Sequence, residues 1–167
     1  KPRLAIIGGG NIANFHCDAF KKAGFNVSHA AGSKNSKNID SFGKKHSIKN
    51  IFSDPLDILR NHEEWDLILL STPTEKNFNY LDSIIELQKP ALIEKPVWTD
   101  PQHLSRFKKN NYPQIRVAYN RRFYSTIQNA KKFIVNEKAV HARMELPEVV
   151  SPNGNYNGVL LNSSHGI

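Results

Sequence analysis

The chain has 167 residues, which is enough for one large hydrophobic core or for one domain and part of another. Its 23 Lys and Arg against 15 Asp and Glu give a formal net charge of +8, but the lysines are scattered through separate polar segments, which argues against a nucleic-acid surface. One cysteine excludes an intramolecular disulfide framework, and no apolar run approaches the roughly 20 residues that span a bilayer, so we expect no membrane partner and take the cytoplasm as the default location.

Short apolar strands alternate with amphipathic helices through the first part of the chain, which is the pattern of a parallel sheet wrapped by helices. The ranges that indicate strands are 3–8, 26–32, 50–53, 66–72, 90–94 and 114–120. In the helix expected over 11–23, Ile12, His16 and Phe20 recur at four-residue spacing and mark one face. Two pairs combine an N-cap with a proline at the first helical position, Asp54-Pro55 and Asp100-Pro101. The sequence therefore predicts a doubly wound α/β domain over residues 1–119.

After residue 119 this alternation stops. A helix is expected over 124–137, and residues 139–146 alternate in the manner of an antiparallel strand. One helix and one strand cannot bury a core of their own. We therefore expect residues 120–167 to be the beginning of a second α/β domain that is truncated here.

A glycine-rich turn lies between the first strand and the first helix. Gly8, Gly10 and Ala13 have the spacing G-x-G-x-x-G/A, in which the glycines allow a tight turn and the close approach of a pyrophosphate. The exposed N–H groups at the start of the helix, with Asn11 and Ile12, would hold the anion. The sequence predicts a Rossmann-type dinucleotide-binding domain; the alternative is that the glycines serve only a tight turn.

The end of the second predicted strand bears on the choice between NAD and NADP. An acidic residue normally stands there on the ribose when NAD is bound. This chain has Ser33 and Lys34 instead, which could receive a 2′-phosphate, so NADP is mildly favoured over NAD. A plain polar turn is the alternative.

Two further turns follow predicted strands at the edge where parallel sheets bind ligands. Ser71, Thr72 and Pro73 could pack against the cofactor, although an ordinary strand–helix turn accounts for them nearly as well. Glu94-Lys95-Pro96 would direct Lys95 toward the nicotinamide, where its ammonium group can stabilise an alkoxide while Glu94 holds or tunes it and Pro96, in a candidate cis bond, fixes the backbone. A solvated surface lysine is the alternative reading.

The segments "RLAIIGGGNIANFHCDAF", "DLILLSTPTEKNFNYL", "ALIEKPV" and "AYNRRF", in this order and spacing, resemble the glucose–fructose oxidoreductase/inositol dehydrogenase family. The resemblance implies an NAD(P)-dependent oxidoreductase acting on a CH–OH group. Its substrate would be a sugar, nucleotide sugar or cyclitol. The C-terminal segment "GVLLNSSHGI" resembles that of members that act in bacterial surface-sugar synthesis. The family resemblance also implies a homo-oligomer formed through the C-terminal domain, and we expect no metal in the site.

The resemblance also assigns roles to individual residues. It makes Lys95 the catalytic lysine and His165 the general acid/base, and it places Arg122, which precedes Phe123, beside the cofactor. It further implies that Asn77 contacts the cofactor and that Asn120 and Asn162 contact the substrate.

The chain departs from the family pattern at three positions. The family usually has Asp where this chain has Asn162, often has His where it has Asn77, and commonly has Pro where it has Ser125. The Asn162 difference keeps a second reading open, a non-catalytic dinucleotide-binding sensor or accessory protein.

Overall fold

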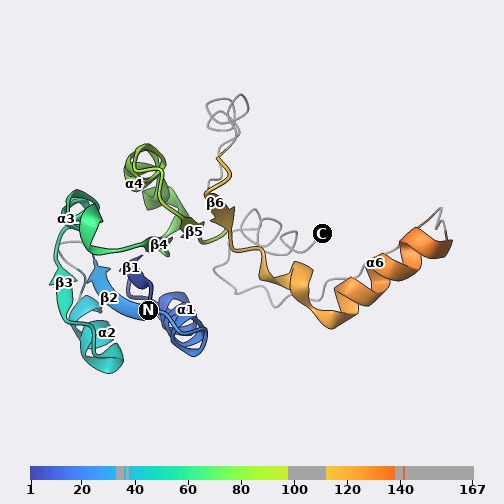
Figure 1. Cartoon of the computed structure of the whole chain (residues 1–167), viewed down its shortest axis with the longest axis horizontal. Helices are drawn as coiled ribbons and strands as arrows, with labels where there is room; N and C mark the ends of the chain where they lie inside the picture. The colour runs from blue at the N-terminus through green and yellow to red at the C-terminus, as the bar shows by residue number, and fades with distance from the viewer. Residues whose placement is uncertain (33–35, 37, 98–111, 138–140, 142–167) are drawn as a thin grey trace, which may run out of the picture. The chain divides into compact units, whose positions relative to one another are not determined.

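The computed structural model describes residues 1–32, 36, 38–97, 112–137 and 141 (Figure 1). The chain divides into two compact units, Lys1–Val117 and Ala118–Ile167. Several sequence predictions lie outside the described residues: the Asp100-Pro101 cap, the strand over 139–146, and the site residues Ser33, Lys34, Asn162 and His165.

The first unit is built on a parallel sheet with the strand order β3-β2-β1-β4-β5-β6, so the predicted doubly wound α/β fold is confirmed. The strands are β1 (Arg3–Ile7), β2 (Asn26–Ala31), β3 (Asn50–Phe52), β4 (Leu67–Leu70), β5 (Ala91–Ile93) and β6 (Ile115–Val117). The helices of this unit are α1 (Asn11–Lys22), α2 (Ile39–His46), α3 (Pro55–Arg60), the short η1 (His62–Glu64) and α4 (Thr74–Glu86).

Helices cover both faces of this sheet. Figure 1 shows α1 and α2 on one side of the strands and α3 and α4 on the other. In β1, Leu4 and Ile6 pack in the cluster beneath α1 and α2, whereas Ala5 and Ile7 pack in the cluster beneath α3 and α4. Burial on both faces explains why the central strands are continuous apolar runs without a polar side.

The predicted apolar face of α1 is wrong in part. The buried residues of the helix are Ala13 and Cys17, whereas the Ile12 side chain is 49% exposed and His16 is only partly buried. The four-residue spacing of Ile12, His16 and Phe20 misled because the start of α1 approaches the sheet closely, and only small side chains fit between them. Of the predicted set, Phe20 alone packs against the core.

The start of α3 has the cap that the sequence predicts. The Asp54 carboxylate accepts a hydrogen bond from the Leu56 N–H at 2.9 Å, and Pro55 occupies the first turn. Nearby, the fully buried Trp65 donates its indole N–H to the Ile58 carbonyl at 2.9 Å, which ties the helix to the chain leading into β4.

The described part of the second unit holds a short 3-10 helix η3 (Asn120–Phe123) and the helix α6 (Ser125–Glu137), close to the predicted range 124–137. In the described ranges, none of the helices combines the length and apolarity needed to cross a bilayer.

Candidate functional site

Three loops meet at the carboxyl edge of the sheet, where the strand order reverses between β1 and β4. They follow β1 at Gly8, β4 at Ser71 and β5 at Glu94. The loops after β1 and β4 touch closely, since a Cβ on Gly8 would lie 2.2 Å from the Ser71 carbonyl oxygen. Gly8 also has a positive φ of +115°, which other residues rarely adopt. Only glycine fits there. An open α/β sheet binds ligands at this edge, beside the reversal point.

The start of α1 has the features of a pyrophosphate site. Gly10 is its N-cap in an extended conformation, with no side-chain cap, and a Cβ placed on Gly10 would meet nothing within 4 Å. Asn11 and Ile12 are exposed in the first turn, whereas Ala13 is fully buried against the sheet. N–H groups at an open helix start attract anions, so this turn fits a dinucleotide's phosphates.

The side chain of Asn77, on α4, is hydrogen-bonded to the loop after β4. The Thr72 hydroxyl donates to Asn77 Oδ1 at 2.8 Å, and Asn77 Nδ2 donates to the Val97 carbonyl at 3.2 Å and the Pro96 carbonyl at 3.4 Å. The Asn77 residue is 1% exposed. It therefore links the loop after β4 to the loop after β5, a role that the sequence did not reveal.

The loop after β5 is held by Glu94. Its backbone N–H donates to the Leu70 carbonyl at 2.8 Å. One carboxylate oxygen accepts the Lys95 N–H at 3.0 Å, and the other lies 2.6 Å from Nε2 of His16 on α1. The Lys95–Pro96 bond is cis, as the sequence suggested. Glu94 thus holds the backbone of Lys95, and its partner His16 is a site residue that sequence reasoning missed.

Two other predicted site residues lie in the second unit. Asn120 and Arg122 belong to η3 in the second unit, where both are exposed and the Arg122 guanidinium lies 5.8 Å from the Phe123 ring centre. The structure brings together at one edge the predicted residues of the first unit, Gly8, Gly10, Asn11, Ile12, Ser71, Thr72, Pro73, Glu94 and Lys95, with Asn77 beneath them. Among the described residues no group of three or more His, Cys, Asp or Glu could hold a metal ion.

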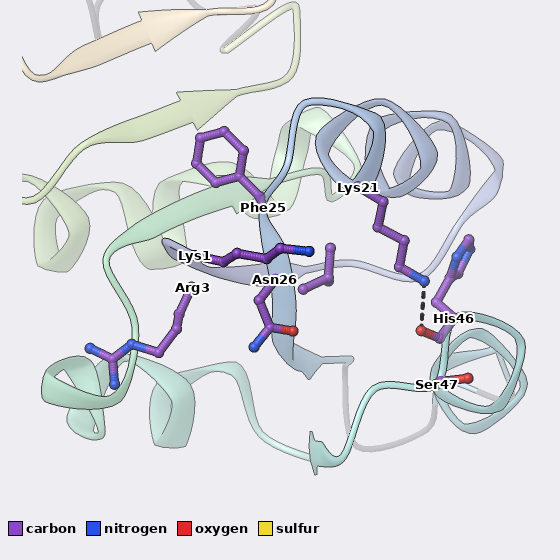
Figure 2. Close-up of a pocket in the computed structure, with 8 residues that line it drawn as sticks. Lys1, Arg3, Lys21, Phe25, Asn26, His46 and Ser47 are labelled. Atoms are coloured by element: carbon purple, nitrogen blue, oxygen red, sulfur yellow. Dashed lines mark hydrogen bonds between the residues drawn. The ribbon is translucent and has the colours of Figure 1, made fainter.

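A cavity of about 610 Å³ lies at the opposite edge, by the amino ends of β1 and β2 (Figure 2). Lys1, Arg3 and Lys21 line it, and Figure 2 shows Lys21 reaching from α1 to the His46 carbonyl, to which it donates at 2.7 Å. The end of α2 presents such carbonyls, and a lysine there satisfies them. Because its lining residues lie by the amino ends of the strands, this cavity is separate from the loops at the carboxyl edge.

An all-parallel sheet of this order, with a glycine turn at the reversal point, defines a Rossmann-type nucleotide-binding domain. Residues 2–111 match the family model described as an oxidoreductase family with an NAD-binding Rossmann fold (Gfo/Idh/MocA), and the chain belongs to this family. The resemblance drawn from the sequence motifs is confirmed. No curated protein sequence matches the chain.

Solved structures share the fold at low sequence identity. Scyllo-inositol dehydrogenase from Lactobacillus casei, with bound NAD(H) and scyllo-inositol, matches with a TM-score of 0.72 at 18% identity, over 83% of this chain and 42% of that chain. The WlbA dehydrogenase from Bordetella pertussis, in complex with NADH and UDP-GlcNAcA, matches with a TM-score of 0.67 at 23% identity, over 81% of this chain and 43% of that chain. The chain thus spans less than half the length of these proteins.

Proposed function

We propose that the protein is an NAD(P)-dependent oxidoreductase acting on the CH–OH group or ketone of a sugar, nucleotide sugar or cyclitol. The observation that carries this proposal is that Glu94-Lys95-Pro96 lies at the same carboxyl edge of the sheet as the glycine turn, with Glu94 hydrogen-bonded to His16 of α1, the helix that starts at that turn. The ligands named for the two similar structures, scyllo-inositol and UDP-GlcNAcA, support the substrate class.

The nicotinamide, when bound, accepts or supplies the hydride. The glycine turn, with Gly8 and Gly10, and the first residues of α1, Asn11 and Ile12, bind the pyrophosphate through backbone N–H groups. Ser71, Thr72 and Pro73, in the loop between β4 and α4, pack against the cofactor.

Lys95 is the group proposed to act on the substrate. Its ammonium group donates a hydrogen bond to the substrate oxygen and stabilises the negative charge that develops there as the C–H bond breaks. His165 accepts or returns the hydroxyl proton. Arg122 contacts the cofactor, and Asn120 and Asn162 orient the substrate. We further propose that residues 120–167 belong to a second domain, through which the protein binds substrate and forms homo-oligomers.

We also propose a mild preference for NADP, because Ser33 and Lys34 follow β2 where NAD-specific domains carry an acidic residue. Titration of the chain with NADH and with NADPH, followed by fluorescence, measures this preference. Replacing Lys34→Glu should then shift the preference toward NADH. A clear preference of the unaltered chain for NADH would contradict the assignment of Lys34 and leave the fold untouched.

The Lys95 assignment is tested by Lys95→Met. We expect NADH affinity to stay within a few-fold, while cofactor reduction with a panel of cyclitols, sugars and UDP-sugars falls by roughly two to three decades, the loss of about 3–4 kcal/mol of charge stabilisation. Near-normal turnover in the variant would mean that Lys95 only belongs to a turn. Tight NADH binding without turnover, over the whole panel, by a protein that includes a complete second domain would favour the sensor or accessory role.

A further inference from the structure

The loop that carries Lys95 is anchored from two helices. Asn77 on α4 bonds the carbonyl of Val97, on one side of Lys95. His16 on α1 bonds the carboxylate of Glu94, on the other side. Lys95 therefore lies between two side-chain anchors that come from opposite faces of the sheet.

The His16 anchor is the more informative of the two because both of its groups are shielded. The two side chains are 20% and 15% exposed, and Nε2 lies 2.6 Å from Glu94 Oε1. An ionised carboxylate only accepts, so Nε2 of His16 donates the hydrogen bond. Hydrogen bonds to charged groups are shorter and stronger than neutral ones, and partial burial strengthens them further. Since the second Glu94 oxygen accepts the Lys95 N–H, His16 fixes the orientation of the group that holds the Lys95 backbone.

His16 also lies in the helix that starts at the glycine turn. Ala13 and Cys17 fix the sheet-facing side of this helix, and both are fully buried. The helix α1 and the Lys95 loop are thus joined by one hydrogen bond, between residues that are 78 positions apart in the sequence.

We propose that His16 is a positioning residue, which acts through Glu94 to hold the Lys95 loop in register with the start of α1. This inference rests on the proposed cofactor site, in which the start of α1 takes the pyrophosphate and the Lys95 loop faces the nicotinamide. His16 then contributes to binding at the nicotinamide end without contacting the cofactor.

Two ligands separate the two ends of that site. ADP-ribose contains the adenosine and the pyrophosphate but lacks the nicotinamide, whereas NADH contains both ends. The affinity of the chain for NADH is measured by fluorescence and that for ADP-ribose by displacement of NADH or by calorimetry. The ratio of the two affinities reports the nicotinamide end alone.

Two amide replacements of His16 form a matched pair. His16→Asn is too short to reach Glu94, and we expect it to lower the preference for NADH over ADP-ribose by about five-fold or more, with ADP-ribose affinity within about two-fold. His16→Gln has an amide nitrogen near the position of Nε2 and should keep the preference of the unaltered chain. Both residues are polar and sit at a partly exposed helical position, so neither should prevent folding.

His46→Gln provides the control for general effects on α1. His46 Nε2 lies 2.8 Å from Oδ1 of Asn14, and Nδ2 of Asn14 donates to the Gly10 carbonyl. His46→Gln should therefore change the two affinities alike. Equal losses for both ligands in His16→Asn, or failure of His16→Gln to restore the ratio, would overturn the positioning role. An unaltered chain that binds both ligands equally would also overturn it and leave the cofactor site standing. Absence of binding for both ligands would refute the proposed cofactor site itself, and this inference with it.

Discussion

At the scale of single residues, Asn77 shows how one buried amide can hold two loops. Its amide nitrogen donates to backbone carbonyls, its amide oxygen accepts a hydrogen bond from the Thr72 hydroxyl, and the residue is 1% exposed. A buried polar side chain is stable only when its donors and acceptors are matched. The match is directional, because carbonyl oxygens require a donor.

Asn77→Asp tests this direction at nearly constant volume. The substitution places a carboxylate oxygen against the Val97 carbonyl, and we expect the free energy of unfolding to fall by roughly 2–3 kcal/mol. Urea denaturation measures the loss. Asn79→Asp, at an exposed position of the same helix, is the control and should stay within about 0.5 kcal/mol. Similar values for the two variants would mean that the Asn77 hydrogen bonds contribute little.

The sequence predicted a candidate site at the carboxyl edge of the sheet, but not these anchors. A glycine spacing or an Asp-Pro cap is read from neighbouring residues, so both were predictable. His16 bonds a residue 78 positions away, and Asn77 bonds backbone carbonyls 19 and 20 positions away. Such partners depend on how strands and helices are arranged in space, and no local pattern encodes them.

At the scale of elements, Gly8 and Gly10 in the turn between β1 and α1 serve different purposes. Gly8 has positive φ and no room for a Cβ, whereas Gly10 has an ordinary extended backbone and open space above it. The first glycine is thus required by the fold, and the second leaves room for a ligand. Their identical appearance in the sequence hides this difference.

Alanine at each position separates the two purposes. Gly8→Ala should lower the free energy of unfolding by about 3 kcal/mol or more, because its Cβ would overlap the Ser71 carbonyl. Gly10→Ala should leave stability within about 1 kcal/mol but weaken NADH binding roughly ten-fold, since the new methyl group would occupy the pyrophosphate's approach. Thermal unfolding and NADH titration of both variants give the comparison. Unchanged NADH affinity in Gly10→Ala would argue against phosphate binding at this turn.

Strand positions were predictable for a related reason. Each central strand is buried on both faces, so its apolar run is unbroken and its identity is clear from composition alone. The spacing of the large residues gave the wrong buried side of α1, because the buried residues, Ala13 and Cys17, are small. Close packing of a helix start on a sheet overrides the usual preference for large apolar residues.

At the scale of the whole first unit, an ion pair joins the starts of β1 and β4. The Arg3 guanidinium donates to Asp66 at 2.9 and 3.2 Å, and the Arg3 backbone N–H donates to the same carboxylate at 2.7 Å. These hydrogen bonds lower the pKa of Asp66 from 3.8 to about 2. Arg3 thereby makes the stability of the unit depend on pH at the acid end.

The sign of this dependence follows from the depressed pKa. Above pH 3.8 the carboxylate is ionised in both states and its stabilising contribution is complete; it is lost as the pH falls to about 2. Asp66→Asn should therefore flatten the acid side of a plot of unfolding free energy against pH in this window. Because the pair is exposed, high salt should reduce the difference between variant and unaltered chain. If Asp66→Asn loses as much unfolding free energy on acidification as the unaltered chain, other groups cause the loss of stability at low pH.

The strand order also sets the sequence in which the sheet can be completed during synthesis. β1 lies between β2 and β4, and Leu4 pairs with Leu67, so one edge of β1 stays open until β4 has left the ribosome. Until then the nascent chain presents an apolar strand with unpaired N–H and carbonyl groups, the kind of edge that chaperones shield. The earliest of these strands to be made is therefore enclosed only when the fourth arrives, and such distant pairing is typical of slowly folding domains.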